Sequence, residues 1–214
     1  MAFIFPKNYQ SLSREEKADW NYLKKIFDRV SFDYKVSKAS KPNLSGFETF
    51  NGQKSLKLLQ SFNIRKDNNQ FTLCLIEYNT SHLEAHSYGG TIRTNSHKYL
   101  FGHLKIDSDF GRAFLRPETI GDKISEFFSS NELDIKGFDK FNRNYHLLTS
   151  DKKKFLTAMN GQLINSIAEL KNVEMEFSGK KCLFRLKKAI DLEETLELCK
   201  LGINMATVAK NNSA

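Results

Sequence analysis

The sequence predicts a single-domain α+β protein, with a mainly antiparallel sheet and helices packed on one face. Residues 58–78 and 173–187 each resemble two short strands joined by a tight turn, the pattern of β-hairpins. The chain lacks the regular strand–helix alternation that builds parallel sheets. The predicted domain covers residues 1–214, with an N-terminal helix at 13–30, a sheet with inserted helices at 56–188, and a C-terminal helix at 191–209.

The helix predicted at 13–30 begins with Ser13 and Glu16, which have the spacing of a capping box. Apolar residues then recur every three or four positions, which predicts one face docked on the core. These residues are Trp20, Leu23, Phe27 and Val30. The polar residues 33–47, punctuated by Pro42 and Gly46, predict a long surface loop.

The first predicted hairpin has a strand from Leu58 to Ile64 and a turn at 66–69. Its second strand, Phe71–Tyr78, is apolar on both faces, which indicates a central position in the sheet. A second loop is predicted at 79–90. One or two further strands follow over 91–106, broken near Gly102.

The segment 110–128 predicts a short strand and then a helix that starts at Pro117 and Glu118. Residues 138–149 predict another strand, on which alternation places four side chains on one face. They are Phe141, Arg143, Tyr145 and Leu147.

One long helix is predicted next, with Gly161 inside it and a single apolar stripe. The stripe consists of Leu156, Met159, Leu163, Ile167 and Leu170. We expect Phe141, Tyr145 and Leu147 to face the core together with Leu156, Leu163 and Ile167. The hairpin at 173–187 follows, and Asp191 with Glu194 predicts the start of the last helix.

Composition excludes whole classes of protein. Of 214 residues, 40% are hydrophobic and 27% are charged, which is globular composition and excludes wholesale disorder. The chain has no apolar run long enough for a transmembrane segment and no N-terminal pattern of a signal peptide. The three isolated cysteines, Cys74, Cys182 and Cys199, predict reduced thiols in the core of a cytoplasmic protein.

The net charge of +8 is concentrated in one part of the chain, because residues 35–105 hold ten Lys/Arg against four Asp/Glu. Such a basic stretch can bind nucleic acid, anionic lipid or an acidic protein, or serve only for solubility. The candidate partner-binding residues are Lys35, Lys38, Lys41, Lys54, Lys57, Arg65 and Lys66.

The function predicted on this basis is a non-catalytic binding or scaffold module with a basic surface. No catalytic residue, metal ligand or cofactor is predicted, since phosphate-loop, dinucleotide and Gly-x-Ser-x-Gly signatures are missing from the sequence. The alternative is a metal-dependent enzyme acting on nucleic acid or phosphoesters. Its candidate groups are His82, His86, His97, His103 and the Asp-x-Lys tripeptides at 33–35 and 134–136.

A further set of residues carries a resemblance over residues 71–206. The set consists of Phe114, Leu115, Pro117 and Glu118, then Leu133, Asp134 and Ile135, then Phe141, Tyr145 and Leu147, and last Val173, Glu174 and Leu183. This pattern resembles a widespread bacterial family that carries only a domain-of-unknown-function label, and whose members are often membrane-anchored. The resemblance implies a fold and no reaction. This sequence lacks the transmembrane segment of the anchored members.

Overall fold

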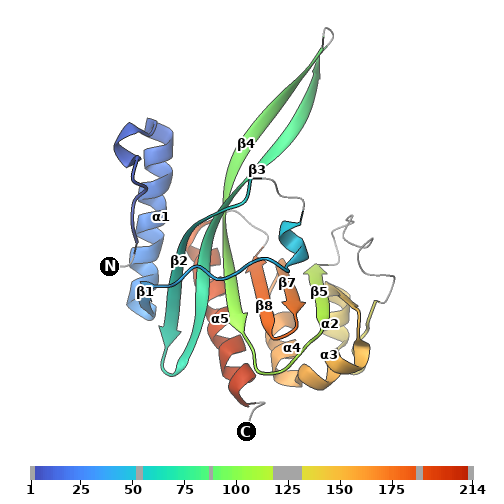
Figure 1. The fold of residues 1–214 in the computed structure, drawn as a ribbon. Coiled ribbons are helices and arrows are strands. Elements are labelled where there is room, and N and C mark those ends of the chain that lie inside the picture. Colours follow the sequence, from blue (N-terminus) through green and yellow to red (C-terminus); the bar gives the residue numbers. More distant parts are fainter. Residues whose placement is uncertain (1–2, 52–54, 87–88, 118–131, 187–189, 212–214) are drawn as a thin grey trace.

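The computed structural model describes residues 3–51, 55–86, 89–117, 132–186 and 190–211. Its strands form one eight-stranded sheet in the order β1-β2-β3-β4-β8-β7-β5-β6, and all the neighbouring strands are antiparallel. The main helices pack against one face of this sheet (Figure 1). The predicted α+β class with helices on one face is therefore confirmed.

The strands are β1 (Lys35–Lys38), β2 (Lys57–Lys66), β3 (Asn69–His86), β4 (Gly89–Lys105), β5 (Arg112–Pro117), β6 (Tyr145–Thr149), β7 (Val173–Ser178) and β8 (Lys181–Leu186). The helices are α1 (Arg14–Asp33), α2 (Asp139–Asn144), α3 (Lys152–Ala158), α4 (Gly161–Ala168) and α5 (Leu192–Asn211), with short 3-10 turns η1 (Tyr9–Ser11) and η2 (Glu48–Phe50). The two predicted hairpins are present as β2–β3 and β7–β8.

Helix α1 confirms the predicted capping box. The side chain of Ser13 accepts a hydrogen bond from the amide of Glu16, and the carboxylate of Glu16 accepts one from the amide of Ser13. The helix ends at Asp33, three residues beyond the predicted end. The strand β1 follows at once, inside the predicted loop 33–47, because its backbone pairs with β2.

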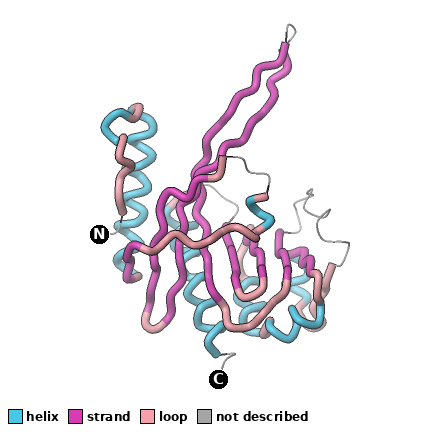
Figure 2. The backbone as a smooth tube through the Cα atoms, in the orientation of Figure 1, coloured by secondary structure: helices cyan, strands magenta, loops and turns pink. Residues whose placement is uncertain are grey.

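The predicted loop at 79–90 and the predicted break near Gly102 are both wrong. Strands β3 and β4 form a continuous paired ribbon, from the pair of Thr72 and His103 to the pair of His86 and Gly89. This ribbon projects from the body of the protein (Figures 1 and 2). Gly102 lies within β4, where a Cβ atom would be 2.0 Å from Cζ of Phe184. Gly102 therefore leaves room for the ring of Phe184 and does not end the strand.

The prediction of a strand through Phe141 is wrong as well. Residues 139–144 form the helix α2, and only Tyr145–Thr149 are extended. Phe141 and Tyr145 are four residues apart, so a helical turn brings both to the same face as well as strand alternation does. The side chain of Asn142 exchanges two hydrogen bonds of 3.0 Å with the backbone of Ile135, which supports the short helix.

The predicted long helix is two helices, α3 and α4. Asn160 caps α4 by accepting a hydrogen bond of 2.9 Å from the amide of Leu163, and Gly161 is its first residue. The break changes which side chains reach the core. Leu163 and Ile167 are buried as predicted, whereas Leu156 on α3 is 43% exposed.

The face of the sheet opposite the helices is covered by residues 39–51, which we call the strap. The strap crosses the sheet from the end of β1 to η2 (Figure 2). It buries Phe47 and Phe50 against Phe101 and Leu183 in a second, smaller core. Its η2 turn is held by Glu176 on β7, whose carboxylate accepts from the amides of Glu48 (2.5 Å) and Thr49 (2.9 Å) and from the Thr49 hydroxyl (2.7 Å).

The helix predicted from Pro117 and Glu118 to residue 128 lies outside the described residues. The final helix is confirmed as α5, and Asp191 accepts a hydrogen bond of 2.8 Å from the amide of Glu194 at its start. All three cysteines are free and buried, as predicted. None of the described helices is long and apolar enough to cross a membrane.

Candidate functional site

The structure brings four of the seven candidate basic residues to the β1–β2 edge of the sheet. Lys35 lies opposite Arg65, and Lys38 and Lys66 belong to the same pair of strands. Strand alternation turns Lys35 and Arg65 toward the strap face and turns the other two toward the helix face. The four residues therefore share an edge without forming one flat surface.

The remaining candidates lie elsewhere. Lys57 is opposite Glu77, with Nζ 3.9 Å from its carboxylate, and is about 26 Å along β2 from Arg65. Lys41 is in the strap, and Lys54 lies outside the described residues. Binding of a polyanion, an anionic lipid or an acidic protein by this basic stretch stays a prediction.

The candidate histidines are not gathered into a metal site in the described part of the chain. His97 and His103 are six residues apart on β4, which places them about 20 Å from each other. The side chains of His82 and His86 are outside what the structure describes. No group of three His, Cys, Asp or Glu side chains that could hold a metal occurs among the described residues.

The cysteines offer no activated nucleophile. Burial raises the pKa of Cys74 and of Cys199 to about 12, and it raises the pKa of Cys182 well above its usual value. A thiol must ionise to attack, so all three stay unreactive at neutral pH.

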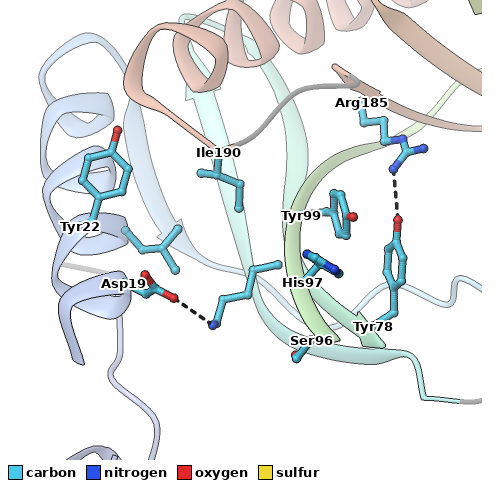
Figure 3. Close-up of a pocket in the computed structure, with 10 residues that line it drawn as sticks. Asp19, Tyr22, Tyr78, Ser96, His97, Tyr99, Arg185 and Ile190 are labelled. Atoms are coloured by element: carbon cyan, nitrogen blue, oxygen red, sulfur yellow. Dashed lines mark hydrogen bonds and ion pairs between the residues drawn. The ribbon is translucent and has the colours of Figure 1, made fainter. Parts of the chain in front are cut away.

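A concave site lies where β4 separates from β8, at the foot of the projecting ribbon (Figure 3). Among the described residues, these strands pair only from Gly102 to Lys105 of β4. Beyond Gly102 they diverge, and a cleft of about 610 Å³ opens, which we call the β4 cleft. It is lined by Asp19, Tyr22, Leu23, Tyr78, Ser96, His97, Lys98, Tyr99, Arg185 and Ile190.

The backbone of β4 presents an open edge to this cleft. The amide of Ile106 donates to the carbonyl of Lys180 at 2.9 Å, which fixes the side of β4 that faces β8. Because successive residues of a strand turn their amides to opposite sides, Leu100, Lys98 and Ser96 point the same way as Ile106. In the described chain, these three positions have no strand partner on that side.

One wall of the cleft is an aromatic pair held by a buried ion pair. The rings of Tyr78 and Tyr99 stack with centroids 4.5 Å apart and an interplanar angle of 9°. The Arg185 guanidinium lies 5.6 Å from the Tyr99 ring centroid and donates to the Tyr78 hydroxyl at 3.4 Å. Arg185 also donates to Glu174, its partner across the β7–β8 hairpin, at 2.5 Å.

These contacts determine the protonation states of Tyr99 and Arg185. Burial and the neighbouring Tyr78 raise the pKa of Tyr99 to about 12, so its hydroxyl stays protonated and able to donate. Burial lowers the pKa of Arg185, but Glu174 and Tyr78 more than offset this, and the net shift is upward. The wall thus offers aromatic surface and hydroxyl groups, with the guanidinium charge already balanced by Glu174.

The other wall comes from α1 and the start of the C-terminal segment. Tyr22 is half-exposed, and Ile190 lines the cleft on the same side (Figure 3). Lys98 is drawn toward α1, with Nζ 3.8 Å from the Asp19 carboxylate and 5.8 Å from the Trp20 ring centroid. The side chain of Lys98 therefore interacts with α1.

Comparison with known proteins adds no assignment, since no family model, no curated protein and no solved structure matches this chain. The resemblance over residues 71–206 therefore stays a prediction.

Proposed function

We propose that this protein is a non-catalytic binding module that accepts an extended polypeptide segment as an added strand on β4. The observation that carries the proposal is the backbone edge at Ser96 and Lys98, which has no strand partner in the described chain and lines a cleft with aromatic side chains. In this mode of recognition, backbone hydrogen bonds give affinity and side-chain pockets give specificity.

The composition of the β4 cleft supports a polypeptide ligand. Stacked tyrosines provide large, rigid contact area at a small entropic cost, and Tyr78 and Tyr99 are already fixed by Arg185. Leu23 and Ile190 add an apolar contact for a side chain of the added strand. Since the charged groups that line the cleft are paired, a segment with aromatic or aliphatic side chains fits it better than a highly charged one.

The open edge also distinguishes the site from ordinary surface. Soluble proteins usually protect free strand edges with charge, proline or a covering element, because an open edge recruits other chains. Here the one lysine on the outward-facing positions of the cleft is engaged by Asp19 and Trp20 of α1. This lysine is thus held by α1, and the edge at Ser96 and Lys98 lines the cleft.

Selection from a phage-displayed library of random peptides tests the proposal. Peptides enriched on the wild-type protein should lose at least tenfold in affinity on Tyr99→Ala, which removes the stacked wall. The matched control is Tyr9→Ala, since Tyr9 is partly buried against Phe5 away from the cleft. Failure to enrich any peptide, or equal loss of affinity in both variants, would contradict the proposal.

Backbone methylation of a selected peptide tests the strand pairing itself. Replacing single peptide N–H groups by N–CH3 removes one donor at a time. Because alternate residues of a strand face the partner, affinity should fall at every second position only. A loss without this two-residue period would mean that side chains alone bind, and strand addition would be wrong.

A further inference from the structure

A second cleft lies toward the opposite end of β4, where β3 and β4 separate. Their pairing begins at Thr72–His103, and beyond that point β3 turns back to β2 while β4 continues beside β8. Helix α5 is visible behind this division (Figure 1). The cleft there has a volume of about 630 Å³, and we call it the fork cleft.

The fork cleft is lined by six elements: the strap, β2, β3, β4, β8 and α5. The strap contributes Ser40, Lys41, Pro42 and Asn43, β2 contributes Asn63, and β3 contributes Gln70, Phe71 and Thr72. The other lining residues are His103, Leu104 and Lys105 of β4, Asp107 just after it, Lys181 of β8, and Ala206 and Ala209 of α5. The set comprises cationic, uncharged polar and apolar side chains.

The cationic side holds two lysines directly opposite each other. Lys105 on β4 pairs with Lys181 on β8. The hydrogen bond from the Ile106 amide to Lys180 makes the adjacent Lys105–Lys181 pair a non-hydrogen-bonded one, the type in which side chains are closest. Like charges in this position destabilise a sheet unless an anion lies between them.

His103 provides a second, independent observation. Its side chain lines the cleft and is only 6% exposed, and its Nε2 has no hydrogen-bond partner in the described structure. Buried polar groups nearly always have a partner, so the ring nitrogen of His103 is an unused hydrogen-bonding group beside two lysines. Burial, then Lys181 and Lys105, lower the pKa of His103 to about 4, so the ring is neutral at pH 7.

The remaining lining complements this charge. The polar groups are the side chains of Asn43, Asn63 and Gln70, which can donate hydrogen bonds. The floor is apolar and is made by Phe71 with Ala206. The lining therefore suits a ligand that combines an anionic group with an apolar body.

We propose that the fork cleft binds a small phosphorylated organic compound, with its phosphate held by Lys41, Lys105 and Lys181 and its body against Phe71. The volume of the cleft is within the range of about 300–1,000 Å³ that is usual for small-molecule sites. Phosphate is favoured over a single carboxylate because the lining holds three lysines and one acidic residue, Asp107. This proposal does not depend on the function proposed for the β4 cleft.

Titration with phenyl phosphate, followed by residue-resolved NMR, tests the site. Chemical shifts should change at Gln70, Thr72 and His103. The double variant Lys105→Gln/Lys181→Gln should bind at least tenfold more weakly than the wild type. Lys25→Gln/Lys153→Gln is the matched control, because it removes the same charge from two exposed lysines outside the cleft and should keep wild-type affinity.

Stability separates a binding role of these lysines from a structural one. Without ligand, the Lys105→Gln/Lys181→Gln variant should melt at or above the wild-type temperature, because the variant removes a repulsive pair.

Three results of the titration would overturn the site: no binding of phenyl phosphate, equal weakening in the two double variants, or phenol binding as tightly as phenyl phosphate.

The titration of His103 provides a final readout. The charged groups that act on it are Lys105 of its own strand and Lys181 of β8. Lys41 of the strap and Asp107 line the same cleft, and Phe47 packs against the His103 ring edge to face. A bound phosphate favours the imidazolium form, so the pKa of His103 should rise when phenyl phosphate is added. An unchanged or lowered pKa would mean that the anion binds elsewhere, which would overturn the proposal.

Discussion

The two faces of the sheet are stabilised by different interactions. The helix face is covered by an apolar core, to which β3 contributes Leu73 and Leu75. The strap face instead buries groups that need partners, among them His103, Glu174 and Glu176. Buried polar groups cost stability unless they are hydrogen-bonded, so burial of the strap face stabilises the fold less than burial of the helix face. Charged or polar side chains of the strap face line both proposed clefts. We therefore associate the polar groups of this face with binding.

The Glu174–Arg185 pair tests this difference most strongly. Arg185→Ala should lower the free energy of unfolding by about 3–5 kcal/mol, because Glu174 would be left buried without its counter-ion. Urea unfolding measures the loss. Replacing both residues by Met should recover most of it, since a buried pair is often no more stabilising than apolar side chains of similar size. A loss below about 1 kcal/mol in Arg185→Ala would show that water reaches Glu174.

On the helix face, the corresponding test is a cavity. Leu163→Ala should cost about 2–5 kcal/mol, because Leu163 is 4% exposed in the main core. Leu156→Ala is the matched control on the preceding helix, where the side chain is 43% exposed, and it should cost less than about 1 kcal/mol. Equal changes in the urea midpoint for the two variants would mean that the assignment of buried faces on α3 and α4 is wrong.

Acid should act on the strap face through His103. Its pKa is about 4 in the folded protein and about 6.5 when unfolded, so the unfolded state binds the proton more readily. The wild type should therefore lose about 2–3 kcal/mol of stability from this group as the pH falls from 6.5 to 4. His103→Gln should lack this component when both proteins are unfolded in phosphate-free buffers. Parallel stability curves for the two proteins would contradict the burial of the histidine.

The sequence predicts the parts of the fold in which local pattern and burial agree. The capping box of α1, the β7–β8 hairpin and the start of α5 each have a short-range signal. The ribbon extension at 79–90 has none, because its polar residues and Gly89-Gly90 favour a loop while backbone pairing decides the outcome. Phe141 and Tyr145 fit either period, so the pattern predicts a strand where the chain forms α2.

The candidate sites were less accessible to sequence reasoning. A charge count identified lysines along 35–105, but it gave no information on which would share a cleft. The Glu174–Arg185 pair could have been found, because the hairpin turn at 179–180 sets these residues opposite each other. The stacking of Tyr78 on Tyr99 depends on the register of β3 and β4, and only tertiary packing places Tyr22 beside the cleft.

Amide hydrogen exchange along β4 tests the proposed binding edge most directly. In the free protein, the amides of Ser96 and Lys98 should exchange faster than those of His97, Tyr99 and Phe101, which face β3. A peptide selected on the wild type should slow the amides of Ser96 and Lys98 at least tenfold and leave the other three unchanged. If the outward amides are already as protected as the inward ones, or if the peptide protects neither set, β4 has no open edge for an added strand.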